Sequence, residues 1–348
     1  PTVGGKMRTR DSVAGPVDIG PTVMTLKGEF ETLFADVDAR LSDHVTLIPD
    51  TILARHFWRD GSVLDLHRDP ARNAEAIGAF AGANAAKQFA RFCDRAARLF
   101  AAFEGPMMQA HSPRLAGLVA HVLKNPTIIP AMAPGFSLAA SLARQFSDPR
   151  LRQLFGRYAT YVGGSPYDSP AVLGLIWQSE ASGVWRVQGG MHKLALAMQD
   201  LALTRGAAFR LGTRAIRIEQ QDGRVIAVHL DDGNRLAADL VVFNGDPKAL
   251  VDGHLGAGPM NAVPRKAVAA RSLSAFVWGF AAEPVGVELA HHNVFFCDDP
   301  AQEFRDLAAG RMPSDGTLYV CAQDRGGAPP MGPERFEIIL NGPPGHPS

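Results

Sequence analysis

The sequence predicts an α+β, or mixed α/β, fold with a discontinuous domain. Strand-like segments near the start give way to a long helical region, and strand-like segments return in the second half. Of the 348 residues, 46% are hydrophobic and 20% are charged, which is enough apolar surface for a packed core. This length favours two domains, or one large domain that carries an inserted one.

The first hundred residues alternate helical and strand-like patterns. Apolar residues with helical spacing predict a helix, and runs of β-branched and aromatic residues predict strands. An Asp-Gly pair at 60–61 lies between two such runs, which indicates a β-hairpin. The predicted elements are a helix over 22–41, strands over 45–49, 52–58 and 63–67, and helix over 70–105.

Residues 115–143 are unusually apolar and carry one formal charge, Lys124. A membrane-spanning helix needs about 20 uninterrupted apolar residues, and prolines break this segment at positions 126, 130 and 134. The segment therefore predicts two short helices joined by a proline-rich elbow. Such helices form either a buried helical hairpin or a surface that dips into one leaflet of a bilayer.

From residue 191 onward a short amphipathic helix precedes a series of strands. Asp-Gly pairs at 222–223 and 232–233 separate the first three strands, which predicts a β-meander. The predicted elements are a helix over 191–203, strands over 209–220, 224–230, 235–245, 273–281, 292–297, 318–323 and 336–340, and short helices over 263–270 and 300–309.

Composition excludes several classes of function. The 35 basic and 35 acidic residues balance, which argues against nucleic acid as a partner. Cys93, Cys297 and Cys321 are too few and too widely spaced for a disulfide framework or a zinc site, and they fit a reducing cytoplasm. The adjacent histidines at 291–292 are expected to face opposite sides of a strand, so no metal site is predicted.

The ends of the chain look like the ends of a fragment. The first residues, PTVGGKMRTR, lack the pattern of a signal peptide. The last residues form a Pro/Gly run directly after an apolar strand-like segment. We therefore expect that the natural protein extends beyond both ends.

Four glycine-centred turns are candidate ligand contacts, because glycine lets backbone N–H groups approach a ligand closely. Each turn taken alone is more typical of an ordinary tight turn, and the GxGxxG fingerprint of dinucleotide sites does not occur. The four sites are Gly4-Gly5-Lys6, Gly20-Pro21-Thr22, Gly189-Gly190-Met191 and Asn244-Gly245-Asp246.

A fifth candidate is the segment RYATYVGGSPY at 157–167. At helical spacing, Arg157, Tyr158 and Tyr161 lie on one face that ends in a Gly-Gly-Ser-Pro stop. A ligand-facing surface and a plain amphipathic helix both account for this pattern.

Taken together and in this order, these segments resemble the flavin-dependent carotenoid desaturases of the bacterial phytoene-desaturase type. That group lies within the amine-oxidase-like flavoprotein superfamily. The variants at 157–167 and 183–195 resemble the branch of purple photosynthetic bacteria that acts on hydroxylated or methoxylated acyclic carotenoids. The matching segments are 4–9, 15–23, 56–62, 157–171, 184–195, 239–247, 291–296 and 318–325.

The resemblance implies an amine-oxidase-like fold with a discontinuous FAD domain, a mixed-sheet substrate domain and a helical, membrane-facing insertion. Its expected parts are a remnant of the FAD domain at 1–25, the substrate and helical region at 26–183, a return to the FAD domain at 184–252, and substrate-domain strands at 253–348. The family's glycine-rich pyrophosphate loop, its ribose-binding acid and its C-terminal FAD segment have no counterpart in this sequence. We therefore expect the chain as given to bind FAD poorly, and its full-length parent to bind it well.

The resemblance also implies which residues contact FAD. Gly4, Gly5 and Lys6 are expected along the pyrophosphate, and Gly20, Pro21 and Thr22 near the flavin. Gly189, Gly190 and Met191 are expected near the cofactor, the strand around Ala215 beside the adenine, and Asn244 with Asp246 at the close of the FAD domain.

The implied reaction is the desaturation of an acyclic carotenoid such as 1-hydroxyneurosporene at C-3,4. A saturated C–H bond is not acidic, so hydride transfer to the flavin must start the reaction, and loss of a neighbouring proton completes it. Tyr158 and Tyr161 are expected to offer their π-faces to the substrate cation, and Arg157, which stays protonated, to position substrate or flavin.

A bilayer-soluble substrate favours a cytoplasmic protein held peripherally at one leaflet of the inner membrane. The final electron acceptor is left open. The alternatives are another enzyme of the superfamily, such as a phytoene desaturase, carotenoid isomerase or amine oxidase, and a non-catalytic fragment without cofactor.

Overall fold

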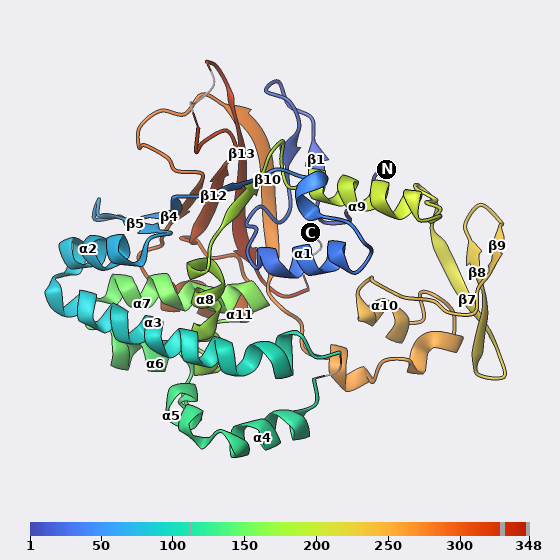
Figure 1. Ribbon diagram of the computed structural model, residues 1–348, viewed down its shortest axis with the longest axis horizontal. Coiled ribbons are helices and arrows are strands. Elements are labelled where there is room, and N and C mark those ends of the chain that lie inside the picture. Colours follow the sequence, from blue (N-terminus) through green and yellow to red (C-terminus); the bar gives the residue numbers. More distant parts are fainter. Residues whose placement is uncertain (112, 328–330, 346–348) are drawn as a thin grey trace. The chain divides into compact units, whose positions relative to one another are not determined.

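The computed structural model describes residues 1–111, 113–327 and 331–345 (Figure 1). The chain divides into two compact units. The smaller unit contains residues 1–3 and 199–272, and the larger unit contains residues 4–198 and 273–348. The boundaries that the sequence predicts for the cofactor and substrate domains remain a prediction.

A six-stranded sheet forms the centre of the larger unit, in the order β10-β13-β12-β11-β4-β5. Its neighbouring strands are antiparallel, except that β11 runs parallel to β4. Strands from both halves of the sequence thus share one sheet, as the discontinuous fold predicts. The strands are β4 (Ile52–Phe57), β5 (Val63–His67), β10 (Ser274–Ala282), β11 (His292–Phe295), β12 (Leu318–Ala322) and β13 (Glu334–Gly342).

The predicted Asp-Gly hairpin joins β4 and β5. The Trp58 N–H donates to the Ser62 carbonyl at 3.0 Å, and Gly61 adopts φ +82°. A left-handed backbone of this kind favours glycine, and the Asp60 carboxylate adds a hydrogen bond from the Ser62 N–H at 2.8 Å. The hairpin prediction is confirmed.

Helices cover one side of this sheet in Figure 1 and bury their apolar faces there. Gly82, with φ +90°, divides the helix predicted over 70–105 into two. The aromatic side chains Phe89, Phe92, Phe155 and Trp177 fill the core between these helices and β4, β5 and β11. The helices are α2 (Pro70–Ala81), α3 (Ala83–Phe103), α6 (Leu138–Gln145), α7 (Pro149–Gly156) and α8 (Ile176–Ala181).

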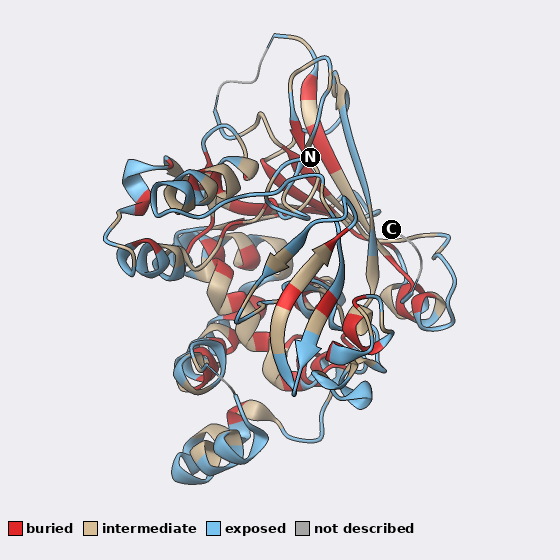
Figure 2. Cartoon of the chain, turned by 90° about the vertical axis from the view of Figure 1, so that its right-hand side faces the viewer, coloured by how far each residue is buried: buried red, intermediate tan, exposed pale blue. Residues whose placement is uncertain are grey.

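The apolar segment 115–143 forms short helices around an elbow, as predicted. Helix α4 (Leu115–Lys124) comes first, then the short turn α5 (Ile129–Met132), and then α6. None of the residues 115–124 is buried, and α4 shows no buried colour at the bottom of Figure 2. Among the described residues, no helix combines the length and the apolar character that crossing a bilayer requires.

Several smaller elements complete the larger unit. The helix predicted over 22–41 is shorter, because Leu26 and Asp38 both have positive φ. The remaining elements are β1 (Thr9–Arg10) paired with β2 (Val17–Asp18), α1 (Lys27–Ala35), β3 (Leu47–Pro49) paired with β6 (Trp185–Val187), α9 (His192–Thr204), which continues into the smaller unit, and α11 (Pro300–Ala308).

The smaller unit is built on the predicted β-meander. Strands β7 (Ala215–Gln221), β8 (Arg224–Leu230) and β9 (Arg235–Ala237) pair antiparallel. Residues 209–214 and 238–245 lie outside the strands, so the first and third strands are shorter than predicted. Ile218, Leu250 and Leu255 form the core against helix α10 (Pro247–Val251).

Candidate functional site

A short hairpin brings the first two predicted glycine sites together. Strands β1 and β2 pair Thr9 with Asp18, and the Ile19 N–H donates to the Arg8 carbonyl at 2.9 Å. A Cβ at Gly20 would lie 2.0 Å from the Lys6 carbonyl oxygen, which is far inside any allowed contact. The close approach of segments 4–6 and 20–22 therefore requires glycine at position 20.

The third glycine site joins this group through Asp18. The Met191 N–H donates to Asp18 Oδ2 at 2.7 Å, and the His192 N–H donates to Asp18 Oδ1 at 3.2 Å. Gly190 has φ +101°, and a Cβ there would lie 2.5 Å from Asp18 Oδ2. The N–H groups at the start of α9 thus bind the Asp18 carboxylate. They are not free to bind a phosphate, although the N-terminus of a helix often binds phosphate in other proteins.

Sequence reasoning missed Asp18, although the segment around it was singled out. The signal was an acidic residue inside the apolar run Val17-Asp18-Ile19 before a glycine. Asp18 is buried, and a buried carboxylate requires hydrogen-bond donors. Here the donors are the backbone N–H groups at the start of α9.

A small cavity of about 130 Å³ lies beside these turns. Asp18, Thr22 and the Gly189–Met191 turn line one side of it. Arg186 and Arg335 also line this cavity, and each is ion-paired, Arg186 with Asp50 and Arg335 with Asp324. The cavity is therefore polar.

Two larger cavities adjoin each other in the same unit. One has a volume of about 440 Å³, and the other has a volume of about 270 Å³. They share four lining residues, so they are neighbours along one wall: Arg157, Thr160, Thr317 and Asn341. The larger cavity is also lined by Gly20, Pro21, Thr22, Val23, Tyr161, Gly163, Leu273, Ser274, Ala275, Tyr319 and Ile339.

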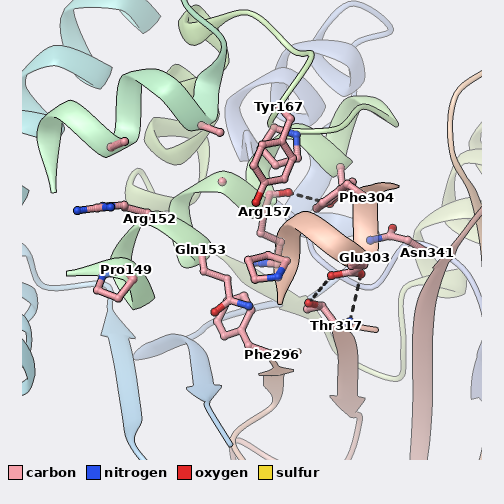
Figure 3. Close-up of a pocket in the computed structure, with 16 residues that line it drawn as sticks. Pro149, Arg152, Gln153, Arg157, Tyr167, Phe296, Glu303, Phe304, Thr317 and Asn341 are labelled. Carbon is pink, nitrogen blue, oxygen red and sulfur yellow. Dashed lines mark hydrogen bonds between the residues drawn. The ribbon is translucent and has the colours of Figure 1, made fainter. Parts of the chain in front are cut away.

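Figure 3 shows the second of these cavities, between α6, α7 and α11. Tyr167 and Phe304 lie edge to face with their ring centroids 6.0 Å apart. Glu303 accepts hydrogen bonds from the Thr317 N–H and hydroxyl at 3.1 and 2.9 Å, so its charge is held against the wall. The rest of the lining combines alanine, proline and phenylalanine side chains with Arg152, Gln153, Arg157, Thr160 and Asn341, and most of the surface that faces the cavity is apolar, which suits an apolar ligand with a polar end.

Arg157, Tyr158 and Tyr161 lie on a 3₁₀ helix, Arg157–Val162, and not on the α-helix that the pattern predicted. Gly163, with φ +68°, ends it at the predicted position. Arg157 and Tyr161 line the larger cavity, whereas Tyr158 is fully buried in the core. The Arg157 guanidinium lies 5.6 Å from the centroid of each tyrosine ring.

Glu180 completes this cluster, and sequence reasoning missed it. The Tyr158 hydroxyl donates to Glu180 Oε2 at 2.6 Å, and the Tyr161 hydroxyl donates to Glu180 Oε1. Burial lowers the pKa of Arg157, but the neighbouring Tyr161, Glu180 and Tyr158 raise it by more, so the guanidinium stays protonated. Burial and Glu180 raise the pKa of both tyrosines, which stay neutral.

The expectation that His291 and His292 face opposite sides is wrong. His291 precedes β11, so strand alternation does not apply to it, and the two rings are 4.5 Å apart. Their ligand atoms and the Cys321 sulfur all lie within 4.8 Å of one another. The Nδ1 atoms already have partners, since His291 contacts the Arg325 carbonyl and His292 contacts the Tyr319 hydroxyl.

The remaining predicted cofactor contacts belong to the smaller unit. Ala215 and Asn244 are exposed there. Asp246 caps α10 by accepting from the Lys248 N–H at 2.9 Å, and it forms an ion pair with Arg271. Asp246 therefore has a structural role, and the cofactor roles of these residues remain predictions.

Comparison with known proteins adds to this geometry. A family model described as flavin containing amine oxidoreductase matches residues 1–276. The hydroxyneurosporene desaturase of Cereibacter sphaeroides is 56% identical over 346 residues, which are 99% of this chain and 70% of that protein. The hydroxyneurosporene desaturase of Rhodobacter capsulatus is 48% identical over 344 residues, again with 99% and 70% covered.

Among solved structures, an oxidoreductase from Methanosarcina mazei resembles this chain with a TM-score of 0.58. The match covers 98% of this chain and 71% of that one, at 16% sequence identity. At this identity the likeness shows a shared fold. The chain spans about 70% of the length of the two desaturases above.

Proposed function

We propose that this protein forms the C-3,4 double bond of an acyclic carotenoid such as 1-hydroxyneurosporene. The chain belongs to the flavin-containing amine oxidoreductases and, within them, to the carotenoid desaturases. The chain is an oxidoreductase with FAD as its cofactor. The relatives named hydroxyneurosporene desaturase support this choice of substrate.

The cavity that Gly20, Pro21 and Thr22 line fits a flavin ring in two respects. Its volume of about 440 Å³ lies in the range of small-molecule sites. Arg157 in its wall has a buried Nε atom without a hydrogen-bond partner among the described residues. A fixed cation with a free donor suits a ring that gains negative charge when it is reduced.

The second cavity, which adjoins the larger one, carries the substrate proposal. A carotenoid is a long hydrocarbon, and the larger cavity that holds the flavin ring cannot also hold all of it. The two cavities share Arg157, Thr160 and Thr317, so the reacting carbons would lie against the flavin in the larger cavity and the rest of the polyene would continue into the second. Apolar burial in the second cavity would fix the reacting carbons in place.

In the proposed reaction the residues of this chain position the substrate, exclude water and handle one proton. The bound flavin supplies the acceptor for the hydride. Arg157 keeps its positive charge beside the cavity, because the nearby Glu180 and the faces of the two neutral tyrosine rings stabilise it. The Tyr161 hydroxyl is occupied by Glu180, so its role is to hold Arg157 in place.

This proposal is tested by producing the protein in a bacterial host that makes 1-hydroxyneurosporene. We expect a carotenoid with one further conjugated double bond, which absorbs at longer wavelength and is resolved by chromatography. Unchanged 1-hydroxyneurosporene together with conversion of neurosporene or phytoene would assign a different carotenoid. Amine oxidation without carotenoid conversion would contradict the proposal.

We further propose that α4 contacts one leaflet of the inner membrane, from which the substrate enters. Leu115, Val119 and Leu123 are spaced four residues apart on one face, and they are 78%, 49% and 71% exposed. Leu118 and Val122 lie next to this exposed strip on the helix surface and are partly buried against the cluster that contains Phe103. An exposed apolar helix face beside basic residues is typical of helices that lie in a membrane interface.

The position of this surface supports substrate entry. The apolar segment continues through the elbow into α6, and Ala139 and Ala143 on α6 line the second cavity. Phe136, just before α6, is exposed as well. A carotenoid that leaves the leaflet at this segment would therefore be near the cavity that we assign to it.

Co-sedimentation with vesicles that contain anionic phospholipid tests the membrane contact. The double variant Leu115→Glu with Leu123→Glu is expected to lose most of its vesicle binding, because charges are costly at the apolar boundary. Val285→Glu is the matched control, since Val285 is 93% exposed and lies outside this segment. Equal vesicle binding by all three proteins would contradict the contact.

A further inference from the structure

Five polar side chains form a buried chain beside the larger cavity. Thr22 Oγ1 lies 3.2 Å from Glu337 Oε2 and 2.9 Å from the Tyr319 hydroxyl. The Tyr319 hydroxyl lies 2.7 Å from His292 Nδ1, and His292 Nε2 lies 3.8 Å from Asp50 Oδ2. Thr22 and Tyr319 line the cavity, and the other three side chains extend away from it into the protein.

The sheet positions these groups. Strand β12 lies between β11 and β13, and Cys321 on β12 is paired with His292 on one side and with Glu337 on the other. Tyr319 is two residues from Cys321, so it shares the same face of the sheet. Asp50 follows β3 and is fixed by the Arg186 Nε–H, which donates to Asp50 Oδ1 at 2.6 Å.

The position of the protons in this series of five side chains decides the direction of each hydrogen bond between them. Threonine and tyrosine each donate one hydrogen, and a neutral histidine donates from one nitrogen only. If Glu337 is protonated, it donates to Thr22, Thr22 to Tyr319, and Tyr319 to His292 Nδ1. His292 Nε2 then carries a hydrogen and lies 3.8 Å from Asp50 Oδ2, which is longer than a hydrogen bond. Neither atom has a hydrogen-bond partner among the described residues, so this last link forms only when the two side chains approach each other. If Asp50 carries the proton instead, Thr22 donates to the Glu337 carboxylate and the other bonds reverse.

The surroundings of these side chains favour the arrangement in which Glu337 carries the proton at neutral pH. Burial raises the pKa of Glu337 to about 8; the Thr22 hydroxyl and the Gly20 backbone oppose this rise, and the nearby Asp18 carboxylate adds to it. Burial also raises the pKa of Asp50, but Arg186 opposes it and the value is about 6. Burial, His291, Arg186 and Arg157 all lower the pKa of His292, which keeps the imidazole neutral, while the Cys321 thiol between the strands stays protonated.

We propose that Tyr319, His292 and Asp50 carry the substrate's proton out of the larger cavity, and that protonated Glu337 sets the direction of this relay. The inference rests on the proposed function and deepens it, because desaturation must release one proton per double bond. It assigns Tyr319 as a catalytic residue at the cavity wall and Glu337 as a positioning residue.

The step balances in atoms and charge. When hydride has left one carbon, the C–H bond of the adjacent carbon breaks and its electron pair forms the double bond. The proton goes to the Tyr319 oxygen, the Tyr319 hydrogen moves to His292 Nδ1, and the Nε2 hydrogen moves to Asp50 Oδ2. Asp50 becomes neutral, His292 changes tautomer without gaining net charge, and Glu337 is unchanged.

Asp50 is a suitable end for the relay. Its partner Arg186 lines the small cavity of about 130 Å³, so the neutral carboxyl is one side chain away from a second opening. Arg186 stabilises the carboxylate and thereby favours release of the proton after each turnover. Tyr161 is the other tyrosine at the larger cavity, and its hydroxyl is committed to Glu180.

Infrared spectroscopy of the purified protein tests the order of the chain without any substrate. At about pH 7 an ordinary carboxyl is ionised, so the carbonyl band of a buried protonated carboxyl is diagnostic. We expect this band in the natural protein, its loss in Glu337→Gln, and its retention in Asp50→Asn. Glu334→Gln is the matched control on β13, because Glu334 is buried but paired with Arg325 at 2.6 Å. A band that survives Glu337→Gln would overturn the assigned direction.

Kinetics of the flavin-loaded protein test the relay itself. Tyr319→Phe keeps the ring and removes only the hydroxyl, and we expect product formation to fall about 100-fold with flavin content unchanged. Asp50→Asn should cause a similar loss, and Glu334→Gln should not. The natural protein should also show a solvent deuterium isotope effect. A natural rate in either Tyr319→Phe or Asp50→Asn would overturn the relay.

These two experiments separate the inference from the proposed function. If the natural protein converts no carotenoid, the proposed function fails whatever the infrared result. If it converts the carotenoid but Tyr319→Phe is fully active, the relay alone fails.

Discussion

Asp18 binds the backbone of Met191 across 173 positions of sequence, with Oδ2 only 2.7 Å from the Met191 nitrogen. This one carboxylate fixes the Gly189-Gly190 turn against the hairpin that carries Gly20. Two of the turns that sequence alone marks as ligand contacts are thereby held in one place. The shape of the small cavity that these turns line depends on the Asp18 interaction and not on the glycines alone.

Asp18→Ala should therefore destabilise the protein and loosen flavin binding. The substitution leaves the Met191 and His192 N–H groups without their acceptor, a loss of about 1–2 kcal/mol. Denaturant unfolding and the ratio of flavin to protein measure the two effects. Asp299→Ala is the control, since Asp299 caps α11 through the Gln302 N–H at the surface. Equal flavin content in both variants would contradict a role for Asp18 at the cofactor site.

Gly20→Ala should be more disruptive than its size suggests. The added methyl group would meet the Lys6 carbonyl at 2.0 Å, so one backbone segment must move. We expect a lower melting temperature and reduced flavin retention. Gly28→Ala is the matched control, because a Cβ at Gly28 meets nothing within 4 Å and Gly28 lies in a helix. A Gly20→Ala protein as stable as Gly28→Ala would contradict the close approach.

Glu180→Gln should show how the cluster around Arg157 is balanced. Glutamine can still accept from both tyrosine hydroxyls, but it removes the negative charge that faces the buried guanidinium. A loss of about 1–3 kcal/mol in the free energy of unfolding is expected, typical of a hydrogen bond to a charged group. Glu31→Gln, which breaks a surface pair with Lys27, should change stability far less. Equal effects would contradict the assigned counterion role.

The contribution of Glu337 to the stability of the fold should fall as the pH rises from about 6.5 to about 8. Glu337 has a pKa of about 8 in the folded chain and an ordinary value of 4.5 when unfolded, so this group binds more protons in the folded state in this range. The buried histidines act in the opposite direction, because their pKa values are lowered in the folded chain and they bind protons near the ordinary value of 6.5 only when the chain is unfolded. The part of the slope that Glu337 causes should approach about 1.4 kcal/mol per pH unit.

Denaturant unfolding at several pH values measures this slope. Glu337→Gln removes this group, so with rising pH its unfolding free energy should rise more, or fall less, than that of the natural protein over the same range. Glu334→Gln should retain the slope of the natural protein. A slope that Glu337→Gln leaves intact would show that another group causes it.

Sequence patterns predict the strands of this protein better than the site. Strands β4, β5, β10 and β12 follow apolar runs bounded by turn residues, and burial in one sheet preserves that local signal. The helix at 70–105 was correct in type, and only the positive φ of Gly82 divided it. The helix predicted over 157–162 became 3₁₀ because tertiary contacts of both tyrosines with Glu180 override local periodicity.

The hydrogen-bond partners in the site could not be predicted from short sequence patterns. Glu180 lies 22 positions from Tyr158 on a different helix, and no short motif joins them. Asp50 and Arg186 are 136 positions apart and meet only through the pairing of β3 with β6. The chain from Glu337 to Asp50 depends on the register of three neighbouring strands, which a single sequence does not specify.

The most direct test of the account is whether a carotenoid is desaturated inside the two adjoining cavities. Ala139 lines only the second cavity, outside the cavity that we assign to the flavin, so Ala139→Trp should fill the space that the polyene needs. In a host that makes 1-hydroxyneurosporene, we expect the natural protein and the exposed control Ala140→Trp to give the product with the additional double bond. Ala139→Trp should keep its flavin and give none. Undiminished conversion by Ala139→Trp would contradict the account.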